Sequence, residues 1–176
     1  HACEAGKYKN TTGPDACTHC GVGKYNPHEN ATSEESCMGC PNRTFANTEG
    51  NAVCSPCPKN ASQGDNATYC VCDAGFKIEN ETDLSCSACP AGKFSGSTNS
   101  AECEDCNMGY FSEQNGSTAC RKCGQGKYNI ETGQSYCKDC FANASQPEGS
   151  SVCVCDAGFK QHSTNQEECE ICPAGK

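Results

Sequence analysis

The chain has 176 residues, of which 21 are cysteine and none is tryptophan, and its formal net charge is −9 at pH 7. Without the cysteines, too few apolar side chains remain for one conventional core, so disulfides formed in an oxidising, extracellular compartment are expected to replace it. The acidic balance and the lack of a basic stripe exclude a nucleic-acid-binding protein. No apolar run approaches the roughly 18 residues of a membrane helix, so this stretch is expected to hold no membrane segment.

The cysteines alternate between long gaps, mostly of 13 residues, and short gaps, mostly of two residues. Dividing the chain within each short gap gives ten loops, each opened and closed by a cysteine, with Cys172 left over. We number them 1 to 10 in chain order: 3–17, 20–37, 40–54, 57–70, 72–86, 89–103, 106–120, 123–137, 140–153 and 155–169.

The loops repeat in blocks of five. The phrase CVCDAGFK occurs at 70–77 and again at 153–160, and loops 4 and 9 share the letters NASQ. Each of these two loops is followed by a one-residue spacer, Val71 or Val154. A fixed internal period of this kind is typical of repeat proteins. We therefore expect two five-loop units, residues 3–88 and 89–171, with residues 172–176 opening a third unit of a longer array.

Paired cysteines of this kind also occur in zinc sites and in redox-active sites. C-x-x-C pairs are typical of structural zinc sites, but here they run on without separating into sets of four, and C-x-C elements interrupt them. A thioredoxin-like redox site needs one C-x-x-C at a helix start, whereas this chain has eight and no helical periodicity. Neither a metal site nor redox catalysis is therefore expected.

Spacing does not strictly determine which cysteines pair. Pairing each cysteine with the next closes every long loop, and closing 13 residues removes about 3 kcal/mol of unfolded-state entropy. Pairing within each C-x-x-C would leave the long loops open. We therefore favour Cys3–Cys17, Cys20–Cys37, Cys40–Cys54, Cys57–Cys70, Cys72–Cys86, Cys89–Cys103, Cys106–Cys120, Cys123–Cys137, Cys140–Cys153 and Cys155–Cys169.

Most loops carry a glycine three residues after the opening cysteine, which predicts a turn with positive φ or a close backbone approach. These glycines are Gly6, Gly23, Gly75, Gly92, Gly109, Gly126 and Gly158. In loop 3, Arg43 stands there, which leaves the turn of that loop undecided. An aromatic residue follows five or four residues after the cysteine, and we expect each ring to pack on a disulfide rather than to bind a ligand. These are Tyr8, Tyr25, Phe45, Phe76, Phe94, Phe111, Tyr128 and Phe159.

The motif CPAGKFS at 89–95 resembles the short cysteine-rich repeats of the ephrin-receptor type and the first disulfide loop of tumour-necrosis-factor-receptor modules. The motif C-x-C-x-x-G-F at 70–76 and 153–159 is similar to the closing half of an epidermal-growth-factor-like domain. The resemblance implies consecutive cysteine pairing and short two-stranded hairpins stacked into a rod. We therefore expect a small disulfide-rich, mostly β or irregular fold, an elongated rod of tandem disulfide-closed hairpin loops with little or no helix.

Eight N-x-[ST] sequons occur, more than chance would place in this composition, and they predict covalent N-glycans rather than any other bound cofactor. The acceptors are Asn10, Asn30, Asn42, Asn60, Asn66, Asn80, Asn115 and Asn143. Asn60 and Asn143 occupy equivalent positions in loops 4 and 9, so we expect these two to share a structural role.

No catalytic constellation is visible. The histidines, His1, His19, His28 and His162, are scattered, and the acidic pairs Glu34–Glu35 and Glu167–Glu168 lie in polar loop stretches. Asp73 and Asp156 near the CDAGFK turns lack the loop pattern of a calcium site. The chain is therefore expected to be no enzyme, to bind no metal and to have no small-molecule substrate.

Two functions fit these features. The first is a structural extracellular glycoprotein, the self-associating repeat subunit of a secreted filament, surface appendage or coat. The alternative is the extracellular stalk of a receptor or adhesion protein, which reaches the cell surface through the secretory pathway. The register that continues at both ends favours the filament.

Overall fold

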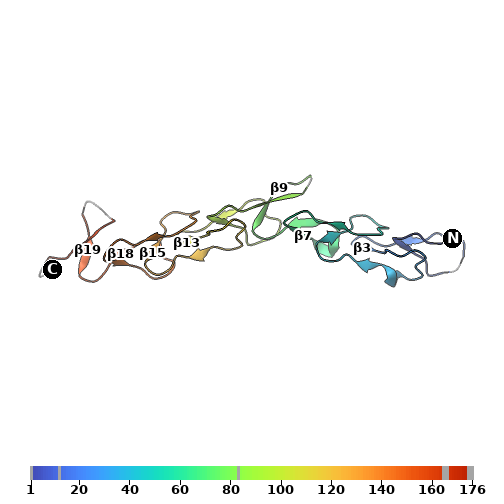
Figure 1. Cartoon of the computed structure of the whole chain (residues 1–176), viewed down its shortest axis with the longest axis horizontal. Helices are drawn as coiled ribbons and strands as arrows, with labels where there is room; N and C mark the ends of the chain where they lie inside the picture. Colours follow the sequence, from blue (N-terminus) through green and yellow to red (C-terminus); the bar gives the residue numbers. More distant parts are fainter. Residues whose placement is uncertain (1, 12, 83, 164–166, 174–176) are drawn as a thin grey trace. The chain divides into compact units, whose positions relative to one another are not determined.

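The computed structural model describes residues 2–11, 13–82, 84–163 and 167–173 (Figure 1). The chain divides into two compact units, one made of His1–Asp73 with Ile78–Cys86 and the other of Ala74–Lys77 with Ser87–Lys176. Each unit is described by itself. In the described ranges, the only helical segments are two single 3-10 turns, η1 (Glu34–Ser36) and η2 (Asp65–Ala67).

Every sheet in the structure is a two-stranded antiparallel hairpin with strands of two to five residues. In a typical hairpin, one strand consists of the fourth and fifth residues after the opening cysteine. The other strand consists of the two residues between the closing cysteine and the next opening cysteine. The pairs in chain order are β1 (Lys7–Tyr8) with β2 (Thr18–His19), β3 (Lys24–Tyr25) with β4 (Met38–Gly39), β5 (Thr44–Phe45) with β6 (Ser55–Pro56), β7 (Ala61–Gln63) with β8 (Cys70–Cys72), and β9 (Phe76–Asn80) with β10 (Ser85–Ala88). They continue with β11 (Lys93–Phe94) and β12 (Glu104–Asp105), β13 (Tyr110–Phe111) and β14 (Arg121–Lys122), β15 (Lys127–Tyr128) and β16 (Lys138–Asp139), β17 (Ala144–Ser145) and β18 (Val154–Cys155), and β19 (Phe159–Gln161) and β20 (Cys169–Ile171).

Ten disulfides close the loops, and each joins a cysteine to the next one in the chain. They are Cys3–Cys17, Cys20–Cys37, Cys40–Cys54, Cys57–Cys70, Cys72–Cys86, Cys89–Cys103, Cys106–Cys120, Cys123–Cys137, Cys140–Cys153 and Cys155–Cys169. With these tandem loops and short strand pairs, the structure confirms the predicted disulfide-rich, mostly β or irregular fold class.

Each loop opens with a tight turn whose third residue has positive φ. In loop 6, for example, the Lys93 amide donates to the Pro90 carbonyl at 3.0 Å, and Gly92 has φ of 86°. Glycine holds this position in seven loops, but Arg43, Asn60 and Asn143 hold it in loops 3, 4 and 9, with φ of 63°, 62° and 59°. Asparagine tolerates this conformation better than most residues, whereas for arginine it costs roughly 1–2 kcal/mol. The turn left undecided at Arg43 is therefore the same turn as in the other loops.

The same third residue ties each loop to the next one. The Gly92 carbonyl accepts a hydrogen bond from the amide of Cys106, the opening cysteine of loop 7, at 2.9 Å. In loops 4 and 9 the one-residue spacer shifts this bond by one position. There the Asn60 and Asn143 carbonyls accept from the amides of Asp73 and Asp156, at 2.9 and 2.8 Å.

Within each unit, loops also contact the loop after the next. A Cβ atom added to Gly92 of loop 6 would lie 2.0 Å from the Gly133 carbonyl oxygen of loop 8. No real side chain tolerates so short a distance, so glycine is required there for close backbone approach as well as for its positive φ. The same approach, at 1.9 to 2.3 Å, occurs at Gly6, Gly23, Gly75 and Gly109.

The buried interior consists largely of cysteine. The opening cysteines of seven loops are at most 9% exposed, namely Cys3, Cys20, Cys40, Cys72, Cys89, Cys106 and Cys123. The aromatic residues that follow them are half-buried, apart from the buried Tyr128. The sulfur atoms therefore supply much of the small core, and the packing of each ring on a disulfide stays a prediction.

Candidate functional site

The repeated phrase CVCDAGFK lies beside the other repeated phrase, NAS, in both halves of the chain. We call these places the junctions: residues 60–62 against 70–73, and residues 143–145 against 153–156. In the first junction Ala61 pairs with Cys72 and Ser62 with Val71, and in the second Ala144 pairs with Cys155 and Ser145 with Val154. The structure therefore pairs the two repeated phrases with each other as neighbouring strands.

A serine and an aspartate fasten each junction. The Ser62 hydroxyl donates to the Asp73 carboxylate, and the Ser145 hydroxyl donates to the Asp156 carboxylate. Hydrogen bonds to a charged acceptor are about twice as strong as those between neutral groups. In the first junction Arg43 Nη1 also donates to Asp73 Oδ2, at 3.3 Å. Sequence reasoning missed this serine–aspartate pair, although the equal spacing of NAS and CVCD in both halves is a signal that would have found it.

The opening turns of the junction loops lack the close backbone approach seen in loops 1, 2, 5, 6 and 7, as do the opening turns of loops 8 and 10. Their opening cysteines, Cys57 and Cys140, are half-buried, as is Cys155 of loop 10, whereas the opening cysteines of the other seven loops are buried. Asn60 and Asn143 occupy the turn position where five other loops have a glycine under a neighbouring carbonyl. A Cβ atom is incompatible with that approach, so no such carbonyl covers these two turns.

The sequon asparagines face outward almost everywhere. Asn60 is half-buried. The exposed ones are Asn10, Asn30, Asn42, Asn66, Asn80, Asn115 and Asn143. In Asn80 and Asn115 the side-chain oxygen accepts a backbone hydrogen bond, from Thr82 and Ala91 respectively, while the amide nitrogen that would carry a sugar is not used in these bonds.

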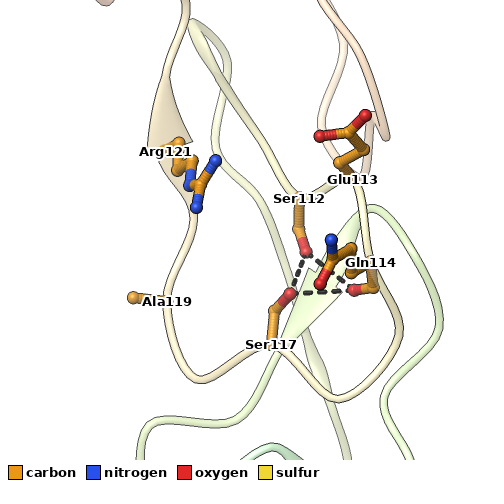
Figure 2. A pocket seen from close by; sticks show the side chains of 6 residues that line it. All are labelled: Ser112, Glu113, Gln114, Ser117, Ala119 and Arg121. Atoms are coloured by element: carbon orange, nitrogen blue, oxygen red, sulfur yellow. Dashed lines mark hydrogen bonds between the residues drawn. The ribbon is translucent and has the colours of Figure 1, made fainter.

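A small pocket lies at the tip of loop 7 (Figure 2). Figure 2 shows the Ser112 and Ser117 hydroxyls converging, 2.6 Å apart, with Ser117 Oγ donating to the Gln114 carbonyl at 2.8 Å. Ser112 is 3% exposed, and its hydroxyl is held by these bonds rather than by a base. Loop 6 repeats the arrangement with Ser95 and Ser100, 2.7 Å apart. We therefore interpret the two serines as stabilising the loop tip by hydrogen bonds, and not as a nucleophilic site.

The candidate acid, base and metal residues do not converge in the described part of the chain. The Glu34 carboxylate oxygen Oε1 lies 3.9 Å from Lys24 Nζ. His28 is exposed, and the His19 side chain packs against Gly50. Glu167 and Glu168 are exposed, and His1 lies outside the described residues. Over residues 2–11, 13–82, 84–163 and 167–173, no three His, Cys, Asp or Glu side chains are grouped as a metal site would require.

One carboxylate near the end of the chain has a shifted pKa. The hydrogen bond from Lys160, at 3.0 Å, lowers the pKa of Glu170 below its ordinary range, with a smaller contribution from His162. Because Glu170 belongs to an exposed cross-strand ion pair between β19 and β20, its shift reflects structure and not catalysis.

None of the helical segments among the described residues has the length and apolar character needed to cross a bilayer.

Comparison with known proteins gives a match to the family model described as tyrosine-protein kinase ephrin type A/B receptor-like, over residues 1–37 and 92–140. The chain is also 37% identical over 75 residues to ephrin type-B receptor 3 of Gallus gallus, which covers 42% of this chain. The matched stretch spans 7% of that receptor's length. These matches confirm the predicted resemblance to ephrin-receptor-type cysteine-rich repeats, and with the disulfides they support an extracellular, receptor-like region.

Proposed function

We propose that the chain is a non-catalytic extracellular spacer, a stalk segment of a receptor or adhesion protein. This proposal rests on which residues match the ephrin-receptor-like family model. Its second stretch, residues 92–140, contains the glycines Gly92 and Gly109, which lie under the backbone of the loop after the next. The resemblance therefore covers the features that stack loops on one another.

The stacking supports a mechanical role. Each loop is closed by its own disulfide. Loop 6, for example, is hydrogen-bonded to loop 7 between Gly92 and Cys106, and its backbone at Gly92 lies close to Gly133 of loop 8. In such quasi-one-dimensional arrays, stability comes from each repeat and its nearest neighbours. A segment built in this way holds a domain at a distance without needing a large core.

The filament, which sequence analysis placed first, receives less support than the stalk. The relative is a receptor, and the ephrin-receptor-like family model matches residues 92–140, which contain the stacking glycines Gly92 and Gly109. The filament hypothesis, unlike the stalk hypothesis, requires that copies of the chain associate with one another into a filament or array. The proposed cell-surface or extracellular location rests on the ten disulfides and the eight sequons.

The two functions differ in the size of the particle. We expect the secreted 176-residue chain to behave as one monodisperse species whose mass, measured by light scattering after size exclusion, stays constant as concentration rises. Negative-stain micrographs should then show short separate particles. Long fibres of constant width, or a mass that grows with concentration, would contradict the stalk and favour the filament.

A further inference from the structure

The two junctions contain the same potential modification site in the same geometry. Asn60-Ala61-Ser62 and Asn143-Ala144-Ser145 are sequons 83 positions apart. In both, the asparagine has positive φ, its carbonyl accepts from the aspartate amide, and the serine hydroxyl is bound by the same aspartate side chain. Among the eight sequons, these two alone have a serine held by a carboxylate among the described contacts.

We propose that Asn60 and Asn143 are paired N-glycosylation sites, and that each sugar is attached before its junction closes. In the transfer, Nδ2 of the asparagine attacks C1 of an oligosaccharide carried on a lipid diphosphate. The N–C1 bond forms, the C1–O bond breaks, the lipid diphosphate leaves, and Nδ2 loses a proton.

The open turn provides room for the sugar. In loops 1, 2, 5, 6 and 7 a carbonyl lies 1.9 to 2.3 Å from where a Cβ of the third residue would stand, so no side chain fits there, still less a glycan. Asn143 is exposed and Asn60 is half-buried. Each has a Cβ atom at this position, so no backbone carbonyl of another loop can lie as close to it as in those five loops. Glycans at these two positions, which are equivalent in the two five-loop units, therefore stand on turns that no neighbouring carbonyl covers.

The serine–aspartate hydrogen bond indicates that the sugar is attached before the junction closes. A sequon is recognised through its asparagine and through the hydroxyl two residues later. Once Asp156 accepts the hydrogen bond from Ser145, and β17 pairs with β18, that hydroxyl is no longer free to meet a transferase. The sugar is consequently added to the open chain, and closure of the junction fixes the result.

The test uses the full chain made without glycans and with its disulfides formed, incubated with a purified oligosaccharyltransferase and a lipid-linked oligosaccharide. Glycopeptide mass spectrometry would measure the modified fraction at Asn60 and Asn143. We expect at least tenfold more modification at both sites in the reduced chain than in the folded chain. Ser145→Ala should abolish modification at Asn143 and leave Asn60 unchanged.

A pair of aspartate variants tests the assigned cause. Folded Asp156→Ala should be modified at Asn143 several-fold more than folded Asp139→Ala, which removes an exposed partner of Lys127 in the same unit but touches no sequon. A reduced chain that accepts no sugar at Asn60 and Asn143 would overturn the site. Equal modification of reduced and folded chains would overturn the order of events, and equal modification of the two aspartate variants would overturn the role of Asp156.

Discussion

Gly92→Ala is expected to destabilise the second unit strongly, whereas Gly126→Ala should cost only the strain of positive φ. Both glycines are third residues of their loops, with φ of 86° and 72°. A Cβ at Gly92 would lie 2.0 Å from the Gly133 carbonyl oxygen, whereas a Cβ at Gly126 has nothing within 4 Å. We expect a cost of roughly 1–2 kcal/mol at Gly126 and roughly 1–3 kcal/mol more at Gly92, because the backbone of loop 8 must shift.

Denaturant unfolding of both variants measures this difference. Hydrogen exchange at the Gly133 amide, which donates to the Cys106 carbonyl at 2.8 Å, should report it locally. Faster exchange is expected in Gly92→Ala and not in Gly126→Ala. Equal stability losses in the two variants would contradict the close approach of loops 6 and 8.

Removing one disulfide should cost roughly 2–5 kcal/mol, and the loss should remain local. In the double variant Cys106→Ala with Cys120→Ala we expect loops 6 to 8 to lose exchange protection, because Cys106 is fully buried and bonds to both neighbouring loops. The matched control is Cys140→Ala with Cys153→Ala, which opens a loop of similar length whose opening cysteine is half-buried. Its cost should be smaller, since less buried contact is lost.

Amide exchange followed by mass spectrometry would locate the loss. Protection in loops 1 to 3 should be unchanged in either double variant. Cooperative melting of the whole chain after loss of one bridge would contradict the nearest-neighbour account of this protein.

Much of the fold could be predicted because its determinants are short-range in sequence. A cysteine pair that encloses about 13 residues, a glycine three positions after the first cysteine and an aromatic residue two positions later all act within one loop. The structure shows why the glycine is there, since Gly92 meets Gly133, a residue two loops away. That reason requires knowing which loops stack, and spacing within one loop does not contain this information.

The exceptions to the glycine rule hold most of what sequence reasoning missed. The sequence places Arg43 at the turn position of loop 3, but it marks Asn60 and Asn143 only as sequons and not as holders of the same turn position. Asparagine is the residue after glycine that best tolerates positive φ, so this assignment was available from residue type. The bonds of Ser62 to Asp73 and Ser145 to Asp156 join a strand residue to the residue that directly follows the partner strand. The one-residue spacer sets that position, which a period count does not reveal.

The central claim is that consecutive cysteines close independent loops that stack on their neighbours, and disulfide mapping of the secreted, non-reduced chain tests it most directly. Proteolysis followed by tandem mass spectrometry should recover ten bridges joining each cysteine to the next, from Cys3–Cys17 to Cys155–Cys169. Bridges within a C-x-x-C pair, such as Cys17–Cys20, or bridges that cross between loops would contradict it.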